Sequence, residues 1–350
     1  MNALLKALAG KLRRRFRPSS KLEYSDRLEN ELAFYKDCPD VHELPDIFHY
    51  WSNKYLAPDM YRFGFSSPNE FFAHYILQSL STLNHQVTHI LSIGSGNCDL
   101  ELAIAKELVE QGYKDFIFEC LDINENMLER GREAAEEAGL IKHFLYTRGD
   151  FNKWAPARKY GVVLANQSLH HVTNLEGLFD SVRLALESDG LFLISDMIGR
   201  NGHMRWPEAM ERLQPFWDEL PKDYRNNRLM DRYEQQYINH DCSTQGFEGI
   251  RAQDILPLLL ERFKFQFFFP YGNMIFVFID RPFGHNFDAD AEWDRDFIDR
   301  VHASDEAGFL SGGLKPTSML AVLTTSETTT LLRHPELSPE HCVRNPQETS

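Results

Sequence analysis

Between residues 88 and 196, short apolar runs alternate with longer stretches of helical periodicity. The five apolar runs contain many branched and aromatic residues, as buried strands do, and they span 88–93, 116–121, 143–148, 160–165 and 191–195. The helical patterns between them span 100–112, 125–138 and 174–188. Because strands that alternate with helices pair in parallel, this pattern predicts a parallel sheet with helices on both faces.

The pattern changes after Asp196. Residues 197–250 are polar, aromatic and punctuated by proline, and they are too long for an ordinary connection, so we interpret them as a mainly helical insert. A helix is predicted at 252–263, followed by apolar runs at 263–269 and 273–280. Runs joined by so short a turn must pair antiparallel. The expected fold is an α/β, Rossmann-like, seven-stranded mixed sheet, parallel except for a terminal antiparallel hairpin.

The two ends of the chain differ from this central region. Residues 20–85 carry helical patterns with many aromatic side chains, most of which we expect to pack within a helical cap. The tail from residue 324 is rich in Thr, Ser, Glu and Pro without periodicity, so we expect disorder there. The predicted organisation is a helical cap over 1–85, a central domain over 86–323 that contains the insert, and a disordered tail over 324–350.

The composition of the chain limits the classes of partner and the cellular compartment that we expect. The chain has 350 residues, of which 43% are hydrophobic, so it can bury a substantial core. Its formal net charge of −15 repels polyanions, which argues against nucleic acid as a partner and favours a small or uncharged substrate. The odd number of cysteines, without paired metal-ligand spacing, favours a reducing, cytoplasmic compartment. These cysteines are Cys38, Cys98, Cys120, Cys242 and Cys342.

No apolar run approaches the length of about 20 residues that a bilayer-spanning helix needs. Residues 1–17 carry their basic cluster after the apolar part, so a signal peptide is not expected. The same segment could form a short amphipathic basic helix on anionic lipid, or a solvent-facing terminal helix. We favour the terminal helix. The oligomeric state is left open by the sequence.

Glycines follow the first predicted strand directly, at Gly94 and Gly96 in the sequence ILSIGSGNCD. Glycine at such a turn lets the backbone pass within contact distance of a ligand. A dinucleotide-binding fold would have a third glycine where Asp99 stands. The negative charge of Asp99 argues against a diphosphate at this loop and favours a ligand with a cationic end.

Acidic residues follow the second and third strands. Asp122 lies at the carboxyl end of the second strand, where a carboxylate can accept hydrogen bonds from both hydroxyls of a ribose. Gly149, Asp150 and Phe151 follow the third strand. Asp150 could accept a hydrogen bond from the exocyclic amine of adenine, and Phe151 could cover the ring. A turn or a helix cap is the alternative interpretation of Asp150.

The fourth strand is followed by ANQSLHHV, which places Asn166, His170 and His171 toward the crevice at the carboxyl edge of the sheet. Ligands of open α/β sheets bind along that edge. His170 and His171 are candidate catalytic residues, because a neutral histidine could take a proton from an attacking hydroxyl or amine; a structural role is the alternative. Two adjacent histidines with no other ligand at metal-binding spacing are a poor metal site, so no metal is expected.

The fifth strand leads into DMIGRNGHMRWPEA, which brings polar and cationic side chains to the same crevice. We interpret this segment as a substrate-recognition loop, with simple packing of its Arg and Trp side chains as the alternative. The candidate substrate contacts are Arg200, Asn201, His203 and Trp206.

In this order, the elements resemble those of the class I S-adenosylmethionine-dependent methyltransferases: a glycine-rich first loop, an acidic second-strand end, a Gly-Asp third loop, an LHHV-containing fourth loop and a terminal hairpin. The resemblance spans about 90–280. It implies that 86–323 form a methyltransferase domain with S-adenosylmethionine as cofactor. It also implies methyl transfer by in-line displacement, with S-adenosylhomocysteine as product. With the net charge of the chain, we expect a small or non-nucleic-acid acceptor. The acceptor atom stays open between oxygen, nitrogen, carbon and sulfur.

The resemblance further implies which residues contact the cofactor. The glycines would lie along its methionine part, Asp122 on the ribose, Asp150 and Phe151 on adenine, and Asn166 near the methionine amino group. The full set of implied cofactor-binding residues is Gly94, Ser95, Gly96, Asp99, Asp122, Ile123, Met127, Gly149, Asp150, Phe151 and Asn166.

The chain departs from the family at two positions. The family usually has an acidic residue where Ser92 stands, and often a glycine where Cys98 stands. These departures leave room for a protein that binds the cofactor, or serves as a scaffold, without catalysing transfer. A nicotinamide-dependent oxidoreductase is a further alternative, which Asp99 and the expected hairpin disfavour.

Overall fold

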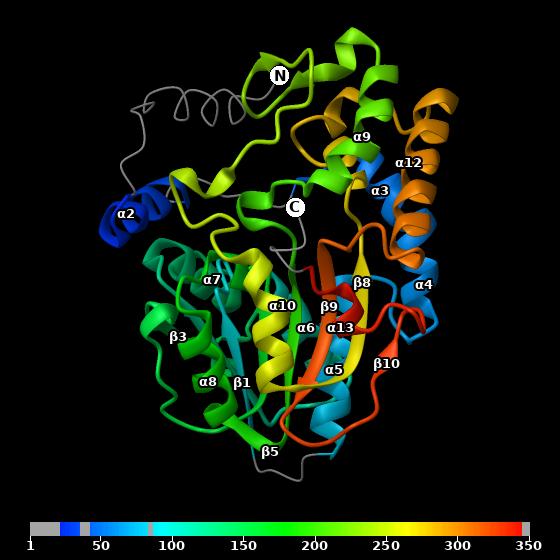
Figure 1. Ribbon diagram of the computed structural model, residues 1–350. Helices are drawn as coiled ribbons and strands as arrows, with labels where there is room; N and C mark the ends of the chain where they lie inside the picture. Colours follow the sequence, from blue (N-terminus) through cyan, green and yellow to red (C-terminus); the bar gives the residue numbers. More distant parts are fainter. Residues whose placement is uncertain (1–21, 36–42, 83–86, 345–350) are drawn as a thin grey trace.

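The computed structural model describes residues 22–35, 43–82 and 87–344 (Figure 1). The basic segment at residues 1–17, which we predicted to be a terminal helix, lies outside the described residues. None of the described helices has both the length and the apolar character that crossing a membrane requires.

The centre of the fold is an eight-stranded mixed sheet with the order β10-β8-β9-β5-β4-β1-β2-β3. Its strands are β1 Thr88–Ile93, β2 Phe116–Asp122, β3 Phe144–Arg148, β4 Tyr160–Asn166, β5 Leu186–Met197, β8 Lys264–Tyr271, β9 Ser318–Thr324 and β10 Leu331–Leu332. Neighbouring strands pair in parallel except at β9, which is antiparallel to both β5 and β8. The Rossmann-like mixed sheet is confirmed, with a two-residue edge strand, β10, beyond the predicted seven.

Helices cover both faces of the sheet. In Figure 1, α8 and α10 lie in front of the sheet, while α5 and α6 lie behind it. The described helices are α2 Tyr24–Tyr35, α3 Asp46–Trp51, α4 Ala57–Tyr61, α5 Pro68–Thr82, α6 Asp99–Glu110, α7 Glu125–Glu137, α8 Leu175–Ala185, α9 Pro207–Glu219, α10 Ala252–Arg262, α11 Ile275–Ile279, α12 Glu292–Leu310 and α13 Pro339–Cys342, with a π-helical turn at Ser52–Leu56. The side chain of Asn124 accepts a hydrogen bond from the backbone N–H of Asn126 and so caps α7.

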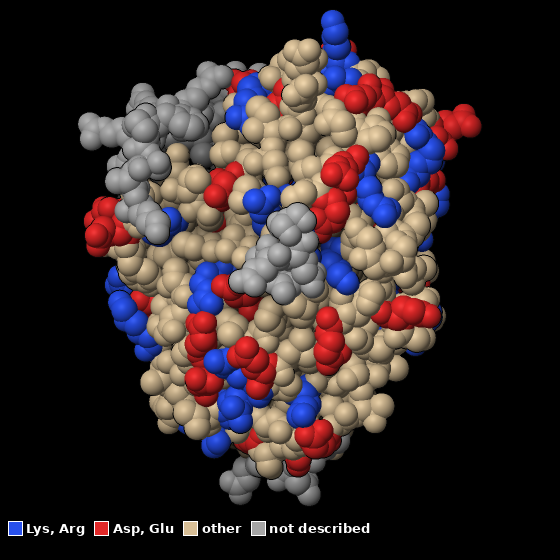
Figure 2. Space-filling view, in the orientation of Figure 1, with Lys and Arg blue, Asp and Glu red and all other residues tan. Residues whose placement is uncertain are grey.

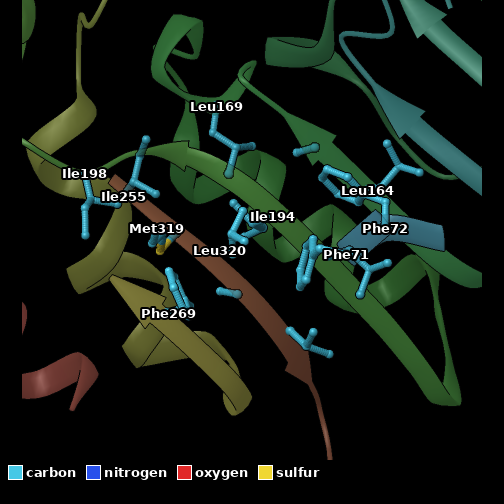
Figure 3. Close-up of a cluster of buried hydrophobic side chains, with 14 of the residues drawn as sticks. Phe71, Phe72, Leu164, Leu169, Ile194, Ile198, Ile255, Phe269, Met319 and Leu320 are labelled. Carbon is cyan, nitrogen blue, oxygen red and sulfur yellow. The ribbon is translucent and has the colours of Figure 1, made fainter. Parts of the chain in front are cut away.

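The core lies between the sheet and these helices. Figure 3 shows buried side chains that converge from α5, the central strands and α10. The labelled residues are Phe71, Phe72, Leu164, Leu169, Ile194, Ile198, Ile255, Phe269, Met319 and Leu320. Burial of such side chains contributes about 1.5–3 kcal/mol each, so this cluster fixes the relative positions of the strands whose loops carry the polar residues.

One predicted strand is wrong. The run at 273–280 contains the helix α11, Ile275–Ile279, instead of the second strand of a hairpin. The carboxylate of Asp305, on α12, accepts hydrogen bonds from the backbone N–H groups of Asn273, Met274 and Ile275 at 2.9, 3.1 and 3.1 Å. This cap satisfies the helix N-terminus, and the helix is buried on nearly all sides, so its apolar run has no amphipathic period to distinguish it from a strand.

The antiparallel partner of β8 is therefore β9, which follows a second insert at residues 272–317. This insert packs against α9 of the first insert through the rings of Phe216 and Phe297, whose centroids are 5.9 Å apart, and through an ion pair between Arg300 and Glu219. In Figure 1, the helices α3, α9 and α12 lie together at the top right. The first insert contains one long helix, α9, and otherwise 3₁₀ turns and the two-residue strands β6 Asn226–Asn227 and β7 Arg232–Tyr233.

The predicted disorder of the tail is wrong for residues 325–344, which include β10 and α13. Arg333 anchors this segment: it is only 5% exposed and forms ion pairs with Asp59 of α4 and Glu306 of α12, each at 3.0 Å. Buried ion pairs of this kind do not require hydrophobic periodicity in the tail, so the composition of the segment gave no signal for them.

Candidate active site

The loop after β1 is shaped by glycine. Gly94 and Gly96 have φ angles of +71° and +56°, in the left-handed region that favours glycine. A Cβ atom on Gly94 would lie 2.5 Å from the Cβ atom of Ser168, so the loop after β4 packs directly on this turn. The hydroxyl of Ser168 also donates a 2.6 Å hydrogen bond to the carbonyl of Ile93. The first and fourth loops are thereby held together at the carboxyl edge of the sheet.

Asp122 joins the first and second loops. Its Oδ2 accepts a 2.9 Å hydrogen bond from the backbone N–H of Gly96, and its Oδ1 accepts one of 2.8 Å from that of Asn124. Burial raises the pKa of this carboxyl. Each oxygen of an ionised carboxylate can accept a second hydrogen bond, so Asp122 can still receive ribose hydroxyls. Nearby, the methyl carbon of Met127 lies 3.3 Å from where a Cβ on Gly96 would be.

The loop after β3 lies beside the same turn. The backbone N–H of Gly149 donates to the carbonyl of Asp122 at 2.9 Å, and the ring of Phe151 lies 3.8 Å from where a Cβ on Gly94 would be. Asp150 accepts hydrogen bonds from the hydroxyl of Tyr24 at 2.9 Å. Burial alone would raise the pKa of Asp150, but its hydrogen bonds, first that from Tyr24, outweigh burial and lower it.

Helix α2 covers these loops. Besides Tyr24, its Arg27 donates to the carbonyls of Ser243 and Gly246, both at 2.5 Å. Its Glu31 lies 2.7 Å from Nδ1 of His171. The helix therefore connects the third and fourth loops to the end of the first insert. We expected residues 20–85 to form a helical cap, but no pattern in the sequence indicated that α2 lies over the candidate site.

His170 is fixed from both sides. Its Nδ1 lies 2.6 Å from Oδ1 of Asp196, at the end of β5, and its Nε2 lies 3.4 Å from Oε1 of Glu248. Burial alone would lower the pKa of His170, but these two carboxylates, Asp196 foremost, outweigh burial and raise it to about 10. His170 therefore carries a positive charge at neutral pH.

Glu248, near the end of the first insert, is the centre of a histidine cluster. Its Oε2 lies 3.4 Å from Nε2 of His171, and its Oε1 lies 2.7 Å from Nε2 of His203. Burial would raise the pKa of Glu248, but the imidazoles, first that of His171, outweigh it and lower the pKa well below the usual range. Burial lowers the pKa of His203. We call His170, His171, His203 and Glu248 the histidine–glutamate cluster.

The predicted substrate residues lie in three different environments. His203 joins the histidine–glutamate cluster, whereas Trp206 lies between two guanidinium groups, with the Cζ atoms of Arg200 and Arg344 at 5.3 and 4.3 Å from its ring centroid. Asn201 exchanges hydrogen bonds with Gln253 of α10. Arg200 and Trp206 thus pack against each other, and their role in substrate recognition stays a prediction.

The remaining predicted residues lie along the same edge. Asn166 is the half-buried last residue of β4, and Ile123 is half-buried directly after Asp122. Ser95 is half-buried in the first loop, and its carbonyl accepts a hydrogen bond from the backbone N–H of Cys98. Asp99 is the exposed first residue of α6.

Sequence reasoning missed three residues that shape the site, namely Glu31, Asp196 and Glu248. Asp196 is fully buried and also accepts hydrogen bonds from the backbone N–H groups of Ser168, Leu169 and Met197 at 3.0, 2.7 and 2.7 Å. Its position at the end of a central strand was a usable signal. Glu31 and Glu248 lie far along the chain from the histidines, and no local pattern marks them.

Replacing Asp196 with alanine is expected to reduce the free energy of unfolding by about 3–5 kcal/mol, because it leaves a buried imidazolium and three backbone donors without their acceptor. Denaturant unfolding would measure this loss, with Asp189→Ala as the matched control, since Asp189 is exposed in the same strand. A loss below about 1 kcal/mol would show that the pair with His170 is not important to stability.

The structure explains why this chain has Ser92 where the family usually has an acidic residue. Its hydroxyl donates a 2.5 Å hydrogen bond to Oε1 of Glu101 on α6, so an acidic side chain reaches the position from the following helix. Glu101 is 2% exposed, and its Oε2 has no hydrogen-bond partner among the described residues. Burial raises the pKa of this carboxyl to about 7.

Glu101 should make stability depend on pH in a specific direction. In the folded state the Glu101 carboxyl keeps its proton up to about pH 7, whereas in the unfolded chain it loses this proton above its ordinary pKa of 4.5. The contribution of the protonated carboxyl to the free energy of unfolding is therefore complete below pH 4.5 and is lost as the pH rises through about 7. Glu101→Gln should therefore gain up to about 3 kcal/mol relative to the wild type between pH 4.5 and 8. Denaturant unfolding of the variant and the wild type at pH 4.5 and at pH 8 checks this, with Glu110→Gln at an exposed position as the control. An equal difference in the free energy of unfolding at the two pH values would refute the prediction.

Comparisons with known proteins agree with this arrangement. A model of the family described as "Methyltransferase domain" matches residues 84–258, half of the chain. Malonyl-[acyl-carrier protein] O-methyltransferase 2 of Ilyobacter polytropus is 24% identical over 132 residues, which are 38% of this chain and 48% of that protein. The chain thus spans about half the length of this curated relative.

Two solved structures are among those to which this chain is similar. The O-methyltransferase of a trans-AT PKS multienzyme from Brevibacillus brevis, in complex with S-adenosyl-L-homocysteine, has 15% identity and a TM-score of 0.46 over 87% of this chain and 88% of that one. A SAM-dependent methyltransferase from Geobacter sulfurreducens, also with S-adenosyl-L-homocysteine, has 12% identity and a TM-score of 0.40 over 74% of this chain and 92% of that one.

The family match and the fold together establish that the chain belongs to the class I S-adenosylmethionine-dependent methyltransferases. Its cofactor is S-adenosylmethionine, and the residues present fit this molecule: the first loop lacks Cβ atoms at Gly94 and Gly96, and Asp122 presents a carboxylate beside it. Which residue contacts which part of the cofactor stays a prediction.

Proposed function

We propose that this enzyme transfers the methyl group to an oxygen atom of a small, non-nucleic-acid acceptor that binds beside the histidine–glutamate cluster. The single observation that carries the proposal is the cluster's position. Ser168, two residues before His170, packs on Gly94 of the first loop, so the imidazoles lie next to the loops that we predict to hold the cofactor. A hydroxyl acceptor must lose a proton on methylation, and imidazole is the side chain best suited to take it near neutral pH.

The two adjacent histidines would have different roles. His170 lies between Asp196 and Glu248 and holds its proton, so it would orient and stabilise negative charge on the acceptor oxygen. His171 has its Nδ1 2.7 Å from Oε1 of Glu31 and its Nε2 3.4 Å from Oε2 of Glu248. We assign proton removal to His171. When bound, S-adenosylmethionine supplies a methyl group on a positively charged sulfur, and in-line transfer of that group leaves S-adenosylhomocysteine.

Two further observations support the proposal. The name of the Ilyobacter polytropus relative specifies an O-methyltransferase, which agrees with oxygen as the acceptor atom. Figure 2 shows Lys and Arg side chains interspersed with Asp and Glu on the face in view, and the whole chain carries a net charge of −15, which fits an uncharged or small acceptor better than nucleic acid. A cytoplasmic location stays a prediction.

The test is an assay of the full chain with methyl-labelled S-adenosylmethionine and a panel of acceptors. The panel would contain small phenols, aliphatic alcohols, carboxylic acids, amines and a carrier-bound malonyl thioester. We expect label to appear on an oxygen of at least one small acceptor, with one S-adenosylhomocysteine formed for each methyl transferred. Label found only on nitrogen, carbon or sulfur would refute the assignment to oxygen, and label found only on the carrier-bound substrate would refute the free small acceptor.

A further inference from the structure

We propose that His170, His203 and Glu248 bind a divalent transition-metal ion. Each of these residues offers one ligand atom, and the three atoms lie within 4.8 Å of one another. The imidazoles direct Nε2 toward the same carboxylate oxygen, at 3.4 Å for His170 and 2.7 Å for His203. Donor atoms around a tetrahedral zinc ion are about 3.3 Å apart, so Nε2 of His203 and Oε1 of Glu248 would have to separate by roughly half an ångström to hold the ion between them.

The outer contacts of His170 are those of a metal ligand. In metal sites, a ligating imidazole commonly donates its other N–H to a carboxylate, which fixes the tautomer and directs the free nitrogen at the ion. The Nδ1 of His170 meets the fully buried carboxylate of Asp196 at 2.6 Å. Asp196 is in turn held by three backbone N–H groups. The ring is therefore immobilised with Nε2 facing Glu248 and His203.

The charges of the region favour a cation. Three carboxylates, those of Glu31, Asp196 and Glu248, meet the three imidazoles of the cluster. Neutral imidazoles would leave this group with three negative charges, which a dication would largely balance. The side chain of Glu248 is 38% exposed, so solvent reaches one side of the cluster and an ion could enter.

The donor set specifies the class of ion. Two imidazole nitrogens and one carboxylate favour zinc or a similar first-row transition metal over magnesium or calcium, which prefer oxygen ligands alone. Three protein ligands leave a coordination position open, as in catalytic rather than structural zinc sites. His171 stays outside this set, with its Nδ1 beside Glu31.

A metal here would deepen the role of the site, and this consequence rests on the proposed function. The ion would replace the proton on Nε2 of His170 and would supply the positive charge beside the acceptor oxygen that the imidazolium supplies in the metal-free protein. The open position would take the acceptor oxygen and lower the pKa of its hydroxyl, and the released proton would pass to His171. The expectation of no metal from the sequence considered only spacing near the two adjacent histidines. The other two ligands, His203 and Glu248, come from the insert after β5 and are brought to His170 by its folding.

The test uses the full chain after treatment with a chelator, titrated with Zn²⁺ and separately with Co²⁺. We expect one equivalent of Zn²⁺ to bind by calorimetry and Co²⁺ to give the visible absorption of a low-symmetry site. X-ray absorption of the zinc-loaded wild type should show two imidazoles and carboxylate oxygen. Glu248→Gln and His203→Ala should each weaken Zn²⁺ binding at least 100-fold, and Asp196→Asn about 10–100-fold.

His240→Ala is the matched control, because His240 is a half-buried histidine of the same insert outside the cluster. It should leave Zn²⁺ affinity unchanged. The inference is overturned if the wild type binds no stoichiometric Zn²⁺, if X-ray absorption shows no imidazole, or if folded Glu248→Gln and His203→Ala bind as the wild type does. S-adenosylhomocysteine titration and methyl transfer by the metal-free protein are measured in parallel, so active protein without metal would refute this inference while leaving the proposed function intact.

Discussion

His171→Ala is expected to lower kcat for methyl transfer by about 10²–10⁴-fold while leaving the affinity for S-adenosylhomocysteine unchanged, because general base catalysis contributes a factor of that size. The substitution removes the imidazole that lies 2.7 Å from Glu31 and 3.4 Å from Glu248, and neither of these two carboxylates is predicted to hold adenosine. Single-turnover kinetics with the acceptor found in the panel assay would measure the effect.

His89→Ala is the control for this experiment, since His89 is a half-buried histidine of β1 that faces Arg158, away from the cluster. His170→Ala should also lose activity, since it removes the charge that orients the acceptor. Retained turnover in both single variants, with normal cofactor binding, would eliminate a catalytic role for the pair. A raised KM with unchanged kcat would instead assign the lost imidazole to acceptor binding.

Asp122→Ala is expected to weaken S-adenosylhomocysteine binding by about 10²–10⁴-fold. Two hydrogen bonds from ribose hydroxyls to a carboxylate contribute about 1.5–3 kcal/mol each, and the same side chain holds the N–H groups of Gly96 and Asn124 in place. Calorimetric titration checks this result. Asp122→Asn separates the two effects, because an amide oxygen can still accept from the backbone but offers no charge to the ribose.

Asp180→Ala is the matched control, since Asp180 is 60% exposed on α8 and pairs with Arg262. It should bind S-adenosylhomocysteine as the wild type does. Equal affinity of the wild type and both Asp122 variants would mean that the second-strand carboxylate does not hold the nucleoside.

The central sheet and its loops were predictable because they depend on local patterns. Short apolar runs indicate buried strands, and the turn at Gly94 requires a conformation that glycine favours. The side chain of Asn124 likewise caps its helix as its position suggested. These features are determined by residues close together in the chain, so a single sequence contains the information for them.

Features that depend on distant partners were not predictable in the same way. The apolar run at 273–280 becomes a helix because Asp305 caps it from another element. Arg333 holds the tail through ion pairs with α4 and α12. The same reason explains the site: Glu248 meets His170 only after the insert has folded over the sheet edge. Local periodicity carries no signal for such contacts, which link residues far apart in the chain.

A crystal structure of the chain with S-adenosylhomocysteine would test the central claim most directly. We expect ribose hydroxyls on Asp122, adenine between Asp150 and Phe151, and the sulfur atom facing the histidine–glutamate cluster. A nucleoside bound away from Asp122, or a sulfur atom that faces away from His170 and His171, would contradict it.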